Sequence, residues 1–153
     1  MQIEPVGLCN LRCRMCPIQF RIDANDGSAA LMNYDMFCRL VDQFPELEEL
    51  HLQGLGEPLL HPRFFDMVRY AARRGVEVST NTNLTALSDR RAQDCVRSGL
   101  ARMHVSLDGA TAKTYELIRT GARFRRVLRN LKRVVDAKTR VGSVWLSASA
   151  HDL

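Results

Sequence analysis

Short apolar segments alternate with amphipathic helical segments along the chain, a pattern typical of a parallel sheet wrapped by helices. Helical spacing of apolar positions predicts helices within residues 34–44, 61–75, 88–98 and 119–140. The predicted strands cover residues 3–6, 50–53, 76–80, 103–107 and 144–148. The fold class is therefore α/β.

Several residues predict where these helices begin and end. Asn33 and Ser88 are expected N-caps because their side chains can accept from free backbone N–H groups. Pro62 suits the first turn of the second helix, which we expect to open at His61-Pro62. Gly75 and Gly99 are expected to close the second and third helices.

Five predicted strands are too few for an eight-stranded barrel, so we expect an open or partial barrel or a doubly wound sheet. The last strand is followed by no helix, and we expect the chain to be one incomplete domain, residues 1–153, of a longer protein. In either architecture the functional residues belong at the carboxyl ends of the strands.

Composition adds little to this picture. Hydrophobic residues make up 46% of the chain and charged residues 25%, as in ordinary globular proteins. The sequence has neither a basic-apolar leader nor an apolar run long enough for a membrane span, so we expect a cytoplasmic protein with no membrane partner.

The net charge of +5 arises largely between residues 119 and 140. Apolar side chains there fall at helical spacing, which leaves the basic ones on the opposite face. No aromatic residues are interleaved for base stacking, so a solvated helix face is favoured over a nucleic-acid surface. RNA binding remains a further reading, which predicts salt-sensitive association.

Cys9, Cys13 and Cys16 crowd into eight positions directly after the first predicted strand. Three thiolates so close together can converge on one metal centre. Four cysteines would saturate a 4Fe-4S cluster, whereas three leave one iron open to a chelating small molecule. Spacing therefore favours a cluster with a vacant position.

A structural zinc site with three cysteines and one histidine is the alternative. Zinc fingers usually carry paired cysteines on both sides of a spacer, which this sequence lacks. Cys38 and Cys95 fall in apolar helix stripes and are expected to be core residues. The candidate fourth zinc ligands are His51, His61, His104 and His151.

Polar and glycine residues follow the other predicted strands. Gly54 and Gly56 let a ligand approach the backbone, and the exposed carbonyls suit an ammonium group, with Glu57 as an acidic partner. If Met103, Val105 and Leu107 face the helices, then His104 and Ser106 face inward, with Asp108 at the rim. Individually, such residues are more often caps or turns.

Three segments in this order resemble the radical S-adenosylmethionine (SAM) superfamily. CNLRCRMC resembles its C-x3-C-x2-C signature, GLGEPLLHP its "GGE" motif, and VSLDGATAKTYELIRTGARF the fourth strand and following helix of the branch with C-terminal SPASM domains. Met15 and Thr82 depart from the pattern, since many members have an aromatic residue and a glycine there. The resemblance implies a partial (β/α)6 barrel truncated after about the fifth strand.

The resemblance also implies a cofactor site. Cys9, Cys13 and Cys16 would ligate three irons of a 4Fe-4S cluster, and SAM would chelate the fourth. Arg119 would pair with the SAM carboxylate. The SAM amino group would be received by Gln53, Gly54, Gly56 and Glu57, and the ribose and methionine side lined by Asn81, Ser106 and Asp108.

The implied activity is reductive cleavage of SAM to methionine and a 5′-deoxyadenosyl radical, which abstracts hydrogen from substrate. The implied partners are an electron donor such as flavodoxin or ferredoxin and a peptide or small-molecule substrate. Cysteine-rich SPASM segments would follow Leu153, so we expect this stretch alone to be weakly active or inactive.

Overall fold

The structure is a computed structural model that describes residues 1–20, 31–141 and 145–149, with side chains described through residue 139. The strands are β1 (Gln2–Ile3), β2 (Glu49–Leu52), β3 (Glu77–Thr82), β4 (Arg102–Ser106) and β5 (Trp145–Ser149). The α-helices are α1 (Tyr34–Asp42), α2 (Phe64–Ala72), α3 (Asp89–Arg97), α4 (Ala112–Ile118) and α5 (Phe124–Val141). Two short 3₁₀ turns, η1 (Pro17–Phe20) and η3 (Pro58–Leu60), complete the described elements.

The five strands form one parallel sheet in the order β1-β2-β3-β4-β5. Each strand therefore pairs with the next along the chain. A doubly wound sheet reverses its strand order at a switch point, whereas a barrel adds strands in sequence. The order confirms the α/β fold of the partial-barrel type and removes the doubly wound alternative.

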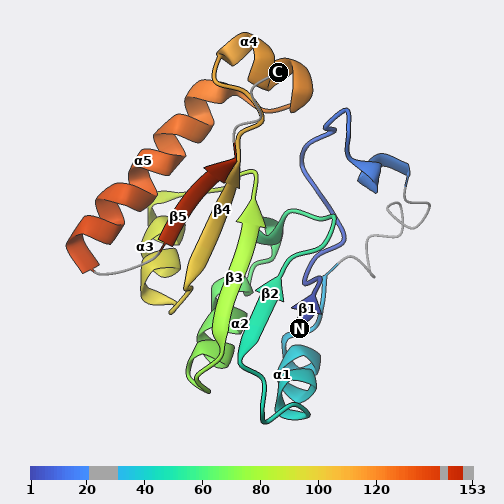
Figure 1. Cartoon of the computed structure of the whole chain (residues 1–153), viewed down its shortest axis with the longest axis vertical. Coiled ribbons are helices and arrows are strands. Elements are labelled where there is room, and N and C mark those ends of the chain that lie inside the picture. The colour runs from blue at the N-terminus through green and yellow to red at the C-terminus, as the bar shows by residue number, and fades with distance from the viewer. Residues whose placement is uncertain (21–30, 142–144, 150–153) are drawn as a thin grey trace.

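The helices cover one face of the sheet and leave the other open (Figure 1). Helix α3 packs against α5, and α1 packs against α2. The covered face is apolar, since Leu50, Val78 and Met103 are fully buried on it. His51, Ser79 and similar side chains face the other way, because side chains alternate across a strand. The open face is thus polar, as expected for His104 and Ser106.

The predicted helix ends are mostly confirmed. The Asn33 side chain accepts from the N–H groups of Asp35 and Met36, and Ser88 accepts from Arg91. Gly75 and Gly99 have φ of +83° and +84°, values that only glycine adopts without strain.

Two predicted elements begin or end elsewhere in the structure, and one helix was not predicted. Strand β1 ends at Ile3, because Pro5 has no N–H to extend the ladder and its carbonyl accepts from Met32 instead. Helix α2 begins at Phe64 and not at His61-Pro62, because η3 precedes it and His61 caps that turn. Helix α4, capped by Thr111, was not predicted as a separate helix.

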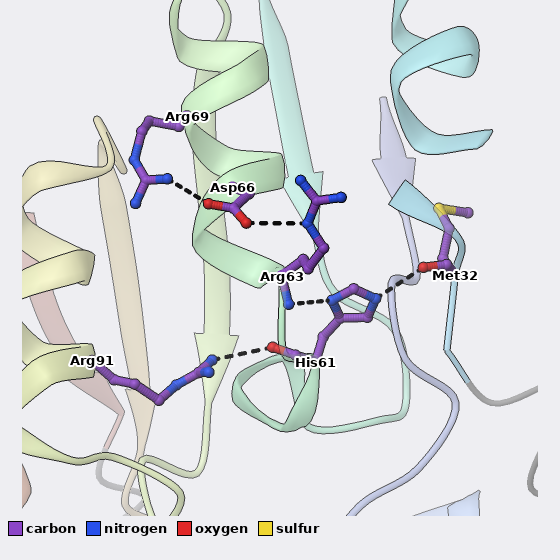
Figure 2. Close-up of polar contacts among 6 residues, drawn as sticks. All are labelled: Met32, His61, Arg63, Asp66, Arg69 and Arg91. Carbon is purple, nitrogen blue, oxygen red and sulfur yellow. Dashed lines mark hydrogen bonds and ion pairs between the residues drawn. The ribbon is translucent and has the colours of Figure 1, made fainter. Parts of the chain in front are cut away.

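His61 joins the segment before α1 to the start of α2 (Figure 2). Its Nε2 lies 2.9 Å from the Met32 carbonyl oxygen, and its Nδ1 accepts from the Arg63 N–H at 3.1 Å. A ring that accepts at Nδ1 and donates at Nε2 is neutral. Burial lowers the pKa of His61, and the nearby Arg91 and Arg63 charges lower it further.

Candidate functional site

Nearly all predicted site residues lie around one cavity of about 250 Å³ at the carboxyl ends of β2, β3 and β4. Asp108 is the exception, since it contacts the site through Arg119. The predicted residues that line the cavity are Cys9, Cys13, Cys16, Gln53, Gly54, Gly56, Glu57, Asn81, Ser106 and Arg119. Cys9 and Arg119, which are 110 positions apart in the sequence, thus converge at the cavity, as parallel topology requires.

The cysteine loop (residues 9–16) is held in place by backbone hydrogen bonds. Arg12 N–H donates to the Thr120 carbonyl at 2.9 Å, and Arg14 N–H donates to Ile118 at 3.1 Å. These bonds fasten the loop to the end of α4. Cys16 N–H donates to the Cys13 carbonyl at 3.0 Å, which turns the loop back toward the cavity.

The three thiols are free and differ in burial. Cys13 is buried, whereas Cys9 and Cys16 are partly exposed to the cavity. Burial raises the pKa values of Cys9 and Cys13, and the Arg119 guanidinium opposes that rise at Cys13. Metal binding removes the thiol protons, so a cationic group beside Cys13 favours the ligating form.

Glycines 54 and 56 fit tightly against the segment after β1. A Cβ on Gly56 would lie 1.9 Å from the Val6 carbonyl oxygen, a separation that atoms cannot adopt. Glu4 Oε1 accepts from Leu55 N–H at 2.6 Å and from Gly56 N–H at 3.1 Å. Close backbone approach explains the glycine here, and the Glu4 carboxylate fixes the loop beside the cysteines.

Glu57 is buried and accepts three hydrogen bonds from within the protein. Thr82 Oγ1 donates at 2.5 Å, and the backbone N–H groups of Asn83 and Leu59 donate at 2.7 and 3.0 Å. Burial raises the pKa of Glu57, and these donors oppose that rise. The carboxylate therefore connects the ends of β2 and β3.

Arg119 forms an ion pair with Asp108 and lies 3.8 Å from Cys13 Sγ through Nη1. Asp108 has a positive φ of 35°, an unfavourable backbone for a non-glycine residue that aspartate tolerates better than most. Both side chains are largely buried, with 16% and 11% of their surface exposed. The predicted SAM-carboxylate partner is thus already paired with a carboxylate of the chain.

Leu84 has a φ of +56°, whereas Thr82 is the last residue of extended β3. We predicted that Thr82 occupies the family's glycine position. A glycine at position 84 would relieve the backbone strain there.

A second hollow of about 520 Å³ lies beside the cavity on the open face of the sheet. Asn81 and Ser106 line both spaces. His51, in the second space, contacts Ser79 Oγ at 2.8 Å and Gln53 Oε1 at 2.9 Å. Gln53 Nε2 donates to the Gly54 carbonyl, so its Oε1 faces His51, which must donate through Nε2.

The histidines proposed as zinc ligands have other surroundings. Both ring nitrogens of His51 and His61 have partners elsewhere, and His104 lines the second hollow. His151 lies outside the described residues. Within the described chain, no three His, Cys, Asp or Glu side chains are placed to surround a single metal ion.

Cys95 is fully buried and Cys38 packs against the core, as predicted.

Sequence reasoning missed Glu4, Asn10, Asn83 and Thr85. Asn83 Nδ2 lies 3.7 Å from Cys9 Sγ. The Asn83 side chain also donates to Asn10 Oδ1 and accepts from the Thr85 hydroxyl. A polar residue directly after strand β3 was visible in the sequence, but its partner 74 residues away was not.

No helix among the described residues is long and apolar enough to cross a membrane.

The chain matches the family model described as Radical SAM superfamily over residues 3–147. It therefore belongs to the radical SAM superfamily, whose members are enzymes.

Two curated proteins show this kinship. The chain is 38% identical over 111 residues to the tungsten-containing aldehyde ferredoxin oxidoreductase cofactor-modifying protein of Pyrococcus furiosus, covering 71% of this chain and 30% of that protein. It is 35% identical over 123 residues to a GTP 3',8-cyclase of a Picosynechococcus species, covering 77% and 37%. The chain thus spans about a third of these relatives.

The fold is similar to that of Streptococcus suis SuiB bound to S-adenosylmethionine. The TM-score is 0.78 at 16% identity, and the match covers 97% of this chain and 33% of SuiB. This likeness confirms the α/β architecture.

Proposed function

We propose that the chain carries the cluster- and SAM-binding part of a radical SAM enzyme. The observation that carries the proposal is that Cys9, Cys13 and Cys16 line one cavity together with residues 53–57, which we call the glycine loop. Three thiols can ligate three irons of a 4Fe-4S cluster and leave one iron for SAM. When bound, the cluster and SAM supply one-electron reductive cleavage that generates a hydrogen-abstracting radical.

The residues of the chain fit this pair of groups. The N–H groups of Leu55 and Gly56 are turned toward Glu4, which orients the glycine loop for backbone binding of the SAM amino group. Glu57 positions that loop and contributes negative charge from behind it. Gln53, Asn81 and Ser106 offer amides and a hydroxyl for the ribose and methionine side.

Arg119 and Asp108 act as a pair in this proposal. Arg119 reaches Cys13 while held by Asp108, so its remaining donors can meet the SAM carboxylate. Asp108 thereby positions the guanidinium and offsets its positive charge at the site. This assigns Asp108 a role through Arg119, because it does not line the cavity itself.

Substrate would occupy the second hollow, which shares the lining residues Asn81 and Ser106 with the first. Its walls offer imidazole, hydroxyl and amide groups, which suit a polar substrate such as a peptide or a cofactor precursor. Two relatives support this class: the cofactor-modifying protein of Pyrococcus furiosus, and the mycofactocin maturase MftC of Mycobacterium ulcerans, to which the chain is 25% identical over 115 residues. A SPASM segment and a flavodoxin or ferredoxin electron donor belong to the same proposal.

Anaerobic reconstitution with iron and sulfide tests the assignment. We expect about four irons per chain and a broad absorption near 400 nm, as for a 4Fe-4S protein. Replacing Cys9, Cys13 or Cys16 by Ala should abolish both, whereas Cys38→Ala should leave both unchanged. Stoichiometric zinc with no cluster would instead support a structural metal site.

A further inference from the structure

Asn83 lies directly between the end of β3 and the cysteine loop. Its Nδ2 is 3.7 Å from Cys9 Sγ and 3.1 Å from Asn10 Oδ1. The residue is 4% exposed, although it lines the same cavity as the three cysteines. A buried amide therefore reaches a sulfur that the proposed function makes a cluster ligand.

The orientation of this amide follows from its partners. Asn83 Oδ1 accepts from the N–H of Thr85 at 2.9 Å and from its hydroxyl at 2.6 Å. Since two donors meet the oxygen end, the NH2 end must face Asn10 and Cys9. The same Thr85 hydroxyl accepts from Asn10 Nδ2 at 2.7 Å, so Asn10, Asn83 and Thr85 form a closed ring in which donors and acceptors match.

The backbone of Asn83 is fixed as well. Its N–H donates to Glu57 Oε2 at 2.7 Å, and Asn130 Nδ2 donates to the Leu84 carbonyl at 2.8 Å. Both Glu57 and Asn130 are buried, with 3% and 0% exposure. An amide held from this many sides keeps its direction toward Cys9 with little freedom to turn away.

We propose that Asn83 is a positioning residue that donates an N–H···S hydrogen bond to the Cys9 thiolate and raises the reduction potential of the cluster. The inference rests on the proposed function, because it requires a cluster on Cys9. Reduction adds negative charge to the cluster and its sulfurs. A donor aimed at one sulfur stabilises the reduced form more than the oxidised form, so it favours electron uptake.

The test is redox potentiometry of the reconstituted protein, followed by the electron paramagnetic resonance of the reduced cluster. Asn83→Leu removes the donor with little change in volume. We expect the equilibrium constant for one-electron reduction to fall about tenfold, which is about 59 mV toward negative potential. Thr85→Val is the matched control, since it removes a hydroxyl of the same ring and leaves the Asn83 NH2 group in place; its shift should be well under half as large.

A second measurement avoids variants that fail to fold. Labelling wild-type protein with ¹⁵N-asparagine should reveal a nitrogen coupled to the reduced cluster in electron–nuclear double resonance, as expected for an amide near a ligand sulfur. A cluster with no coupled asparagine nitrogen, or an unchanged potential in Asn83→Leu, would overturn the assignment to Asn83 while leaving the proposed function intact. Wild-type protein that assembles no cluster would overturn both.

Discussion

Arg119 pairs with Asp108 and at the same time lies 3.8 Å from Sγ of Cys13. One guanidinium thus joins the end of α4 to the cysteine loop and to Asp108, the second residue after β4. Both members of the pair are mostly buried. Removing one member leaves an uncompensated charge in a poorly solvated place.

Arg119→Met should lower the free energy of unfolding by about 3 kcal/mol, because Asp108 is left without its partner. Adding Asp108→Asn should restore most of that loss, since asparagine is neutral and tolerates a positive φ. Urea unfolding of the metal-free protein measures both values. SAM affinity of the cluster-loaded double variant should stay low, which separates ligand binding from stability.

Gly56→Ala should cost more than about 3 kcal/mol or prevent folding, because the new Cβ meets the rigid Val6 carbonyl at 1.9 Å. Gly54→Ala should cost about 1 kcal/mol, since it meets the flexible Glu4 side chain, which can move. Urea unfolding compares the pair. Equal losses would contradict this account of the glycine loop.

Acidification should weaken the fold through His61. Its pKa is lowered in the folded protein, so below its ordinary value of 6.5 the unfolded chain binds more protons. The free energy of unfolding should therefore fall as pH drops from about 7.5 to about 5.5. His61→Gln should reduce this dependence, because glutamine does not titrate. Identical pH profiles for both proteins would show that His61 is not the responsible group.

Tyr115→Phe should not destabilise the metal-free protein. Tyr115 is fully buried, and its hydroxyl has no hydrogen-bond partner within the described residues. Burial also raises its pKa to about 12, so it stays protonated. Removing an unsatisfied buried hydroxyl is neutral or stabilising by up to about 1 kcal/mol. A clear loss in thermal unfolding would mean that the hydroxyl has a partner in solution.

The sheet was predictable because two signals are local in the sequence: apolar and polar residues alternate along a strand, and glycine ends a helix. Residues 76–80 read as a strand from the same pattern that places Val78 in the core. The convergence of strand ends also followed, since parallel strands share one carboxyl edge. The clustering of the three cysteines and residues 53–57 around one cavity was therefore predictable from the sequence.

Contacts between distant residues could not be predicted. Asn83 and Cys9 are 74 positions apart. Nothing in the sequence shows that Thr82 and Asn83 donate to the Glu57 carboxylate. The short α4 was missed because it follows a strand and precedes a longer helix, although Thr111 is a readable N-cap. The start of α2 was misplaced because η3 was not expected.

The most direct measurement of the central claim is the electron paramagnetic resonance spectrum of the reduced, reconstituted protein with and without SAM. Binding of SAM to an iron that has no cysteine should change the g-values of the cluster signal. The same change should disappear when Gly56 is replaced by Ala in any protein that still assembles a cluster. A cluster signal that SAM leaves unaltered in the wild-type protein would contradict the account.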